Sequence, residues 1–358
     1  MSKFVEYLYI YSFMNNNVIF VIELSIGRWI MKNIKKYLKE NYIIIIITTL
    51  VTIITFYPLP YYVESPGGLT NVNDRIRLGD KKINGSYNLT YINEYKCTFP
   101  VLIYAYLKAD FNIYKKKEIL LDNETDKDYN TRDRLFLEES LSNATIAAYK
   151  KAGKKISVTS SYVYVGYNLN DSKNNLKVGD KIISIDGVKI STKDEIYSEV
   201  KKKKVKEKVK IIVERNNKNY EVNSEIYSKT GKKIIGFYPI EIYNYDTNPK
   251  ISIKMSNKES GSSGGLMLSL AIYDILSKED IAKGRTIAGT GTITKDGKVG
   301  KIGGIRYKVK TAAKNKVDVF LVPISNYKEA KQTVKKFNLR INLVKVKTLN
   351  DAIEYLKK

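Results

Sequence analysis

Histidine is absent from this chain of 358 residues, and cysteine occurs once, at Cys97. Without histidine the chain cannot build a Ser-His-Asp triad, a Cys-His pair or a His-ligated metal centre. A single cysteine also excludes an internal disulfide framework and a thiolate metal cluster. We therefore expect no metal and no other cofactor, and any serine nucleophile in this chain needs a base other than imidazole.

Acidic residues are scarce relative to basic ones, with 37 Asp and Glu against 62 Lys and Arg, which gives a formal net charge of +25. Such an excess is compatible with nucleic-acid binding. The lysines are scattered through every segment, however, and we attribute them to a biased genome and expect no nucleic-acid partner. The length leaves room for two or three domains with proper cores.

A long uncharged stretch, residues 42–57, is rich in isoleucine, and no charge follows it until Glu64. With the next few residues it approaches the length of about 20 residues that spans a bilayer. The lysines that precede it are Lys32, Lys35, Lys36 and Lys39. The positive-inside rule then predicts a cytoplasmic segment over 1–40, a transmembrane helix over 41–60 and an extracytoplasmic remainder, with membrane lipid as one partner.

A cleaved signal peptide is the alternative interpretation of this stretch. The residues that follow it, 57–62, are bulky and offer no small-x-small cleavage site, which favours an uncleaved anchor. A second apolar patch at 18–22 is interrupted by Glu23 and Arg28, too soon for a span. We interpret residues 1–30 as an upstream extension before Met31, with a half-formed membrane segment as the alternative.

The segment 61–152 is predicted to be an extracytoplasmic α/β region. Residues 87–92 alternate apolar with polar and 101–106 are almost continuously apolar, which indicates two strands or a strand–helix pair. Residues 132–152 carry Phe136, Ser140 and Ala144 at helical spacing, which predicts a helix.

The segment 153–230 has a different pattern. A strand is expected at 163–165, and Gly179-Asp180 opens a second strand that ends in a hairpin turn at Asp186-Gly187. A helix over 192–203 with Ile196 and Val200 inward precedes two strands at 208–214 and 219–227. This order and the string Leu-x-Val-Gly-Asp-x-Ile-x-x-Ile-Asp-Gly resemble a PDZ domain, a fold that binds extended peptides at a sheet edge. A β-rich spacer is the alternative.

From residue 231 onward a serine-glycine loop becomes the centre of interest. An alternating strand at 251–255 leads into Gly261-Ser262-Ser263-Gly264-Gly265, and an apolar helix pattern follows to 276. Ser263 therefore lies at a helix N-terminus, where free N–H groups and the helix dipole can stabilise an oxyanion. An ordinary N-cap serine is the alternative, and this loop by itself favours it.

A second glycine-rich run changes that assessment. Residues 286–294 alternate like a strand, 295–298 form a hairpin turn, and Gly303-Gly304 enters a helix that carries Lys308. A buried strand at 317–323, a helix at 325–337 and a strand at 341–346 are expected after it. A lysine on a helix can serve a serine nucleophile if burial keeps its amine neutral.

These motifs together resemble the proteolytic domain of Lon. Three strings carry the resemblance. Gly-Ser-Ser-Gly-Gly occupies the place of the family's Gly-Pro-Ser-Ala-Gly, and Gly-Thr-Ile-Thr that of Gly-Glu-Ile-Thr. Lys-Ile-Gly-Gly-Ile-x-x-Lys occupies the place of Pro-Ile-Gly-Gly-Leu-x-x-Lys. With the anchor and the PDZ-like segment, the chain resembles the membrane-anchored PDZ–Lon-like proteases of Gram-positive bacteria. The fold class implied is α+β, with a Lon-type α/β proteolytic domain over 231–358.

The resemblance also implies the site residues and the activity. It places the nucleophile at Ser263 and the general base at Lys308, with Thr290 as a hydrogen-bond partner and Gly261, Ser262 and Gly264 in the supporting loop. The implied activity is that of a serine endopeptidase acting on peptides or exposed protein segments, and Lon-type domains often assemble as homo-oligomeric rings.

Two departures from the family pattern concern the loop. Ser262 replaces the proline before the nucleophile and Gly264 replaces the alanine after it, which predicts a more flexible loop. A catalytically inactive peptide-binding adaptor at the membrane is therefore the alternative function. The sequence has no Gly-x-x-x-x-Gly-Lys-Ser/Thr nucleotide loop, so we expect activity without ATP.

Overall fold

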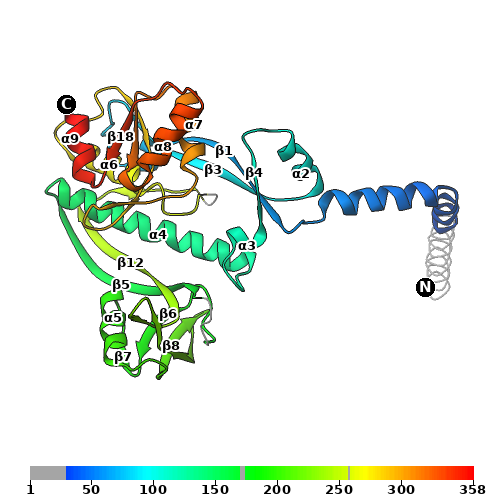
Figure 1. The fold of residues 1–358 in the computed structure, drawn as a ribbon, viewed down its shortest axis with the longest axis horizontal. Coiled ribbons are helices and arrows are strands. Elements are labelled where there is room, and N and C mark those ends of the chain that lie inside the picture. Colours follow the sequence, from blue (N-terminus) through cyan, green and yellow to red (C-terminus); the bar gives the residue numbers. More distant parts are fainter. Residues whose placement is uncertain (1–29, 170–173, 257–258) are drawn as a thin grey trace, which may run out of the picture. The chain divides into compact units, whose positions relative to one another are not determined.

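The computed structural model of the chain describes residues 30–169, 174–256 and 259–358 (Figure 1). The interpretations of residues 1–29 lie outside this part of the chain. The described residues form two units, one of residues up to Leu59 together with Lys96–Tyr104, the other of Pro60–Tyr95 and Ala105–Lys358. The first unit contains a helix of 27 residues, Ile30–Phe56, which by length and composition is long and apolar enough to cross a membrane.

A six-stranded mixed sheet forms the centre of the second unit. Its order is β18-β17-β14-β3-β1-β4. The strands are β1 (Tyr61–Asn71), β3 (Ser86–Lys96), β4 (Asn112–Lys115), β14 (Thr286–Gly289), β17 (Val319–Pro323) and β18 (Leu343–Val346). The pairs β3–β14, β14–β17 and β17–β18 are parallel, whereas β1–β4 is antiparallel.

This sheet corrects the division drawn from the sequence between 61–152 and 231–358. Strands from both segments pair directly, with Ser86 opposite Thr286 and Leu89 opposite Gly289. The two segments therefore build one folding unit, and the region before the PDZ-like segment supplies half of the central sheet. A parallel pairing over such a chain separation leaves no local trace in the sequence.

Helices cover both faces of the sheet. They are α4 (Asp126–Lys151), α6 (Gly265–Leu276), α7 (Ile305–Lys314), α8 (Ile324–Lys336) and α9 (Leu349–Lys357). On β17, Val319 and Leu321 pack into the core that contains α6 and α9, while Phe320 and Val322 pack into the core that contains α7. The alternation of buried residues follows from the period of two in a strand buried on both faces.

A second sheet, of order β12-β5-β6-β8-β9 with β7 beside β6, contains the strands of the PDZ-like segment 153–230 and adds β12 from beyond it. Its elements are β5 (Lys155–Asn168), β6 (Lys181–Ile185), β7 (Val188–Lys189), α5 (Lys193–Lys202), β8 (Lys208–Arg215), β9 (Lys218–Glu225) and β12 (Phe237–Asn248). The predicted turn is confirmed, since Asp186 and Gly187 both have positive φ, at 46° and 82°, as a type I′ hairpin requires. Ile196 and Val200 are buried as expected.

The strands β5 and β12 pair along their whole lengths and connect the second sheet to α4 (Figure 1). Short elements complete the chain: η1 (Asn73–Arg75), β2 (Ile76–Arg77), α2 (Phe99–Tyr106), α3 (Lys116–Ile119), β10 (Tyr227–Lys229), β11 (Lys232–Ile234), β13 (Ser252–Ile253), β15 (Thr292–Ile293) and β16 (Val299–Gly300). Two expected strands are shorter than predicted. The strand at 251–255 shrinks to β13, and the strand at 286–294 breaks between β14 and β15.

Candidate active site

The serine loop, residues 261–265, is hydrogen-bonded to α4. The backbone N–H of Gly261, whose φ is +77°, donates to the carbonyl oxygen of Asp133 at 2.9 Å. Two turns further along the same face of α4, Ser140 Oγ donates to the carbonyl oxygen of Ser262 at 3.1 Å. A Cβ on Gly265 would lie 2.6 Å from Ser140 Oγ, so the close approach of loop and helix requires glycine there.

Ser263 and Lys308 are in direct contact. Lys308 Nζ lies 2.7 Å from Ser263 Oγ. Ser263 stands just before α6, and Lys308 projects from the first turns of α7, which Gly304 starts in the left-handed conformation with φ +65°. The lysine is 3% exposed, so the two residues that the motifs singled out meet in a closed environment.

Burial changes the acidity of the lysine. Loss of solvent lowers the pKa of Lys308 from 10.5 to about 8, because an ammonium group is poorly stabilised away from water. Within the described residues, desolvation is the one cause of the pKa shift of Lys308, and no acidic group counteracts it. The amine is therefore available in its neutral, basic form close to physiological pH.

Thr290 fixes the orientation of this pair. Thr290 Oγ1 donates to the carbonyl oxygen of Ser263 at 3.1 Å. Since a hydroxyl has one proton, Thr290 Oγ1 accepts the contact with Lys308 Nζ, also at 3.1 Å. A neutral amine that gives one N–H to Thr290 can direct its lone pair at the proton of Ser263 Oγ.

The break between β14 and β15 serves the same loop. The N–H of Gly291 donates to the carbonyl oxygen of Ser263 at 2.8 Å, and the N–H of Leu266 donates to the carbonyl oxygen of Gly291 at 3.0 Å. Gly291 thus leaves the sheet ladder to bind the start of α6, whereas the N–H of Thr290 still donates to the carbonyl oxygen of Leu321 on β17 at 3.1 Å. This explains why the expected continuous strand is interrupted.

The start of α6 presents candidate oxyanion donors. Among the residues that the structure describes, the backbone N–H groups of Ser263 and Gly264 donate to no carbonyl oxygen. They lie where the dipole of α6 is positive. Gly264 stands where the Lon family has alanine. A Cβ at this position would lie 3.3 Å from Leu89 Cδ2.

Two cationic side chains close to Lys308 in the sequence, Arg306 and Lys310, are directed elsewhere. Arg306 Nη2 donates to Asn112 Oδ1 at 2.8 Å, and Lys310 pairs with Asp110. The sequence predicts a helix at Ser140 but no role for it in the site. Its signal was a serine at a buried position of an otherwise apolar helical stripe.

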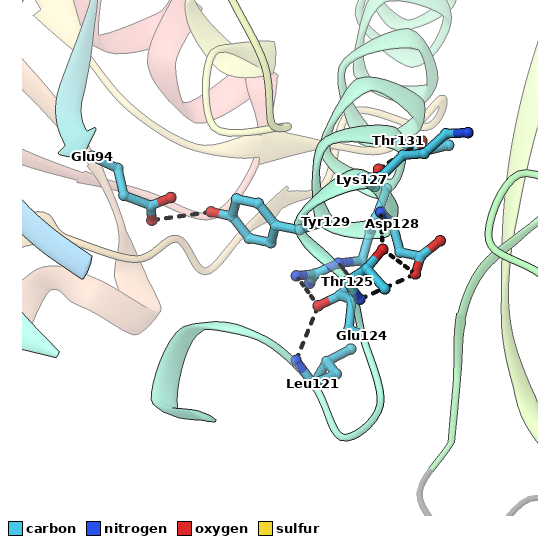
Figure 2. Close-up of polar contacts among 9 residues, drawn as sticks. Glu94, Leu121, Glu124, Thr125, Lys127, Asp128, Tyr129 and Thr131 are labelled. Carbon is cyan, nitrogen blue, oxygen red and sulfur yellow. Dashed lines mark hydrogen bonds and ion pairs between the residues drawn. The ribbon is translucent and has the colours of Figure 1, made fainter. Parts of the chain in front are cut away.

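A cleft of about 1050 Å³ opens in front of Ser263 and Lys308. Its walls include Leu89, Tyr91, Tyr129, Asp133, Phe136 and Met255. Figure 2 shows Tyr129 reaching from α4 toward Glu94 at the end of β3, where its hydroxyl donates to Glu94 Oε2 at 3.1 Å. Burial raises the pKa of Glu94 to about 7, so this end of the cleft carries a weak acid.

The start of α4 is stabilised by its own side chains. Thr125 Oγ1 accepts from the N–H of Asp128 at 3.2 Å, and Asp128 Oδ2 accepts from the N–H of Thr125 at 3.1 Å (Figure 2). This capping box holds the first turn, which carries Tyr129 into the cleft. No group of three His, Cys, Asp or Glu residues in the described ranges could hold a metal ion.

Comparison with protein families finds matches to two parts of the chain. Residues 245–357 match the Lon protease (S16) C-terminal proteolytic domain, and residues 150–226 match the PDZ domain. The chain carries a Lon-type proteolytic domain and a PDZ domain. The Lon-type domain contains Ser263, Thr290 and Lys308, and its class indicates a peptidase.

Curated relatives support the Lon-type domain. The chain is 26% identical over 188 residues to the Lon protease of Campylobacter jejuni, covering 50% of this chain and 22% of that protein. It is 27% identical over 96 residues to the Lon protease of Trichlorobacter lovleyi, covering 27% of this chain and 12% of that protein. The chain thus spans about a fifth or less of the curated relatives it matches.

Solved structures of PDZ domains are similar in sequence to part of this chain. The PDZ domain of the SdrC-like protein from Listeria monocytogenes is 29% identical, with 24% of this chain and 93% of that chain covered and a TM-score of 0.21. The corresponding domain from Listeria innocua is 32% identical, with 22% and 92% covered and a TM-score of 0.21.

Proposed function

We propose that this chain is a serine endopeptidase in which Ser263 is the nucleophile and Lys308 is the general base. The observation that carries the proposal is the 2.7 Å contact between Ser263 Oγ and a buried amine whose pKa lies near 8. A serine hydroxyl is a weak nucleophile until a neighbouring base takes its proton. No histidine exists to do so.

The arrangement supports a two-step acyl transfer. Neutral Lys308 takes the proton of Ser263 Oγ as the oxygen attacks the scissile carbonyl carbon, and the carbonyl oxygen becomes an oxyanion near the N–H groups of Ser263 and Gly264. The lysine ammonium then gives its proton to the leaving amine. Water next attacks the acyl-enzyme, with Lys308 accepting its proton and returning one to Ser263 Oγ.

The substrates follow from the membrane segment and from the lack of a nucleotide loop. We place the helix Ile30–Phe56 across the membrane with its lysine-rich start in the cytoplasm and the Lon-type domain outside. The sequence holds no nucleotide loop, and we propose cleavage without ATP. Flexible peptides and exposed protein segments are the substrates that need no unfolding.

Two contacts support a gating role for the PDZ domain. Lys193 Nζ, at the start of α5, donates to Glu139 Oε1 on α4 at 2.6 Å. The next residue on α4, Ser140, holds the carbonyl of Ser262 beside the nucleophile. A peptide bound beside α5 would therefore act on a helix that positions the serine loop.

A smaller pocket of about 350 Å³ lies along this route. It is lined by Lys193 of the PDZ domain, by Tyr238 of β12, by Ser140 and by Ser262 of the serine loop. The strand β12, to which Tyr238 belongs, is an edge strand of the PDZ sheet. Since PDZ domains bind peptides by adding a strand at a sheet edge, we propose that substrate recognition and the serine loop share this wall.

The test uses the full chain in detergent with a peptide library and mass spectrometry of the products. Ser263→Ala and Lys308→Ala should each abolish cleavage and leave the thermal unfolding transition cooperative. Ser260→Ala and Lys310→Ala are the matched controls, because both lie beside the motif residues and outside the proposed chemistry. Cleavage retained by either Ser263→Ala or Lys308→Ala would refute the assignment, and binding of peptides without turnover by the unsubstituted chain would favour the adaptor function.

A further inference from the structure

The helix α2 (Phe99–Tyr106) presents large apolar and aromatic side chains at the surface of the described chain. Exposed fractions are 49% for Phe99, 48% for Ile103, 53% for Tyr104 and 78% for Tyr106. The helix contains no charged residue, and Ala105 is its one buried residue. Packing inside the protein therefore does not account for its composition. A contiguous exposed apolar surface of this kind is typical of an interaction site.

The length of the N-terminal helix indicates where α2 lies relative to a bilayer. Glu40 is the last charged residue before the apolar stretch, and from there to the end of the helix at Phe56 the rise is about 24 Å, at about 1.5 Å per residue. A hydrocarbon core is about 30 Å thick. The helix therefore ends short of the outer boundary, and the residues just after Phe56 reach it.

A backbone hydrogen bond links the residues just after the N-terminal helix to the residues just before α2. The N–H of Leu59 donates to the carbonyl oxygen of Cys97 at 2.8 Å. Cys97 stands two residues before the first residue of α2. The start of α2 is thereby fixed at the level where the membrane-spanning segment leaves the hydrocarbon.

The side chains of α2 suit that level. Tyrosine is enriched where hydrocarbon meets headgroups, because its ring is apolar and its hydroxyl reaches water. Tyr104 and Tyr106 supply such groups, and Phe99 and Ile103 supply apolar surface without polar atoms. Helices that lie in the interface plane bury a face of this kind in the headgroup boundary.

We propose that α2 lies in the outer interface of the lipid bilayer, as a second membrane contact beside the span. This inference rests on the proposed transmembrane role of Ile30–Phe56. With two points of contact, rotation of the extracytoplasmic part about the axis of the span is restricted. A single helix leaves that rotation free.

The test places nitroxide spin labels on the full chain reconstituted in liposomes of phosphatidylcholine and phosphatidylglycerol. Ile103→Cys and Tyr106→Cys report on α2, Ile47→Cys reports on the span, and Val188→Cys, at an exposed position of the PDZ domain, is the aqueous control. All are made with Cys97→Ala, and the unsubstituted chain sets the background from Cys97, which is buried. Relaxation by oxygen and by a water-soluble nickel chelate is measured at each position.

The proposal predicts that the labels at 103 and 106 meet oxygen more and the nickel chelate less than the label at 188. If the label at 47 is embedded while those at 103 and 106 meet the chelate as freely as the label at 188, the inference on α2 is wrong and the span stands. If the label at 47 meets the chelate freely, the span and α2 both fail. Dipolar broadening between labels at 103 on different molecules would assign the face to a second copy and overturn the proposal.

Discussion

The low pKa of Lys308 predicts a distinctive pH dependence of cleavage. Its neutral form is the base, so kcat/KM should rise with pH and level off above the pKa of about 8. At pH 7 about one-tenth of such an amine is neutral, and at pH 9 about nine-tenths, from the titration of a single group. The expected gain between these two values is about tenfold.

The magnitude follows from burial. With the ordinary pKa of 10.5, only about 3 in 10,000 molecules would be neutral at pH 7, so desolvation increases the active fraction by about 300-fold. That factor corresponds to a shift of about 3 kcal/mol in the balance between the two protonation states. Burial of Lys308 thus accounts for a large part of the basicity that Ser263 needs.

The assay is the initial rate of cleavage of one fluorogenic peptide, with substrate well below KM, across pH 6 to 10. Lys308→Arg is the matched variant, because its guanidinium keeps the charge and does not lose its proton in this range. It should be inactive at every pH. A profile that is flat from pH 6 to 9, or that rises only above pH 10, would refute the argument that burial makes Lys308 the base.

Three further predictions concern the same site. Lys308→Met should raise the free energy of unfolding at pH 7 by up to about 3 kcal/mol, because it removes an ammonium group that the folded state disfavours. The difference in Tm from the unsubstituted chain should shrink as pH rises from 8 toward 10.5, because above 10.5 the lysine is neutral in the folded and the unfolded state alike. Thr290→Val leaves an N–H of Lys308 without its acceptor and should lower kcat by about 10- to 100-fold, equivalent to about 1–3 kcal/mol. Thr290→Ser should retain activity. Equal kcat values for the Val and Ser variants would contradict the role of Thr290 in orienting Lys308. Ser140→Ala removes the hydrogen bond to the Ser262 carbonyl, and we expect kcat to fall several-fold while the unfolding free energy falls by only about 1 kcal/mol; a change in KM alone would argue against positioning of Ser263.

The sequence supported the local features of this fold because their signals are local. Asp186-Gly187 forms its hairpin since aspartate and glycine tolerate positive φ. The pairing of Ser263 with Lys308 is implied by the resemblance to the Lon proteolytic domain, whereas the residues themselves indicate that each stands at the start of a helix, after a glycine-rich turn. Such features depend on a few neighbouring residues.

The sheet that joins the segments 61–152 and 231–358 had no such signal. β3 and β14 pair across most of the chain, and a parallel pairing is specified by complementary burial on both faces rather than by any turn. The spacing of α4 indicates only that Ser140 is buried, because its partner, the Ser262 carbonyl, belongs to a segment over a hundred residues later. Contacts of long chain separation set the support of the site, while local motifs set its reacting groups.

The paired strands β5 and β12 give the PDZ domain an attachment unlike that of a module on a flexible linker. Both ends of the domain leave through one antiparallel ribbon, and the far half of β12 is fastened to α4 where Tyr245 Oη donates to Thr145 Oγ1 at 3.1 Å. A ribbon of two hydrogen-bonded strands resists bending within its own plane far more than a single chain does. The PDZ domain is therefore restricted to twisting and hinging about this ribbon, and each such motion bears on the helix that supports the serine loop.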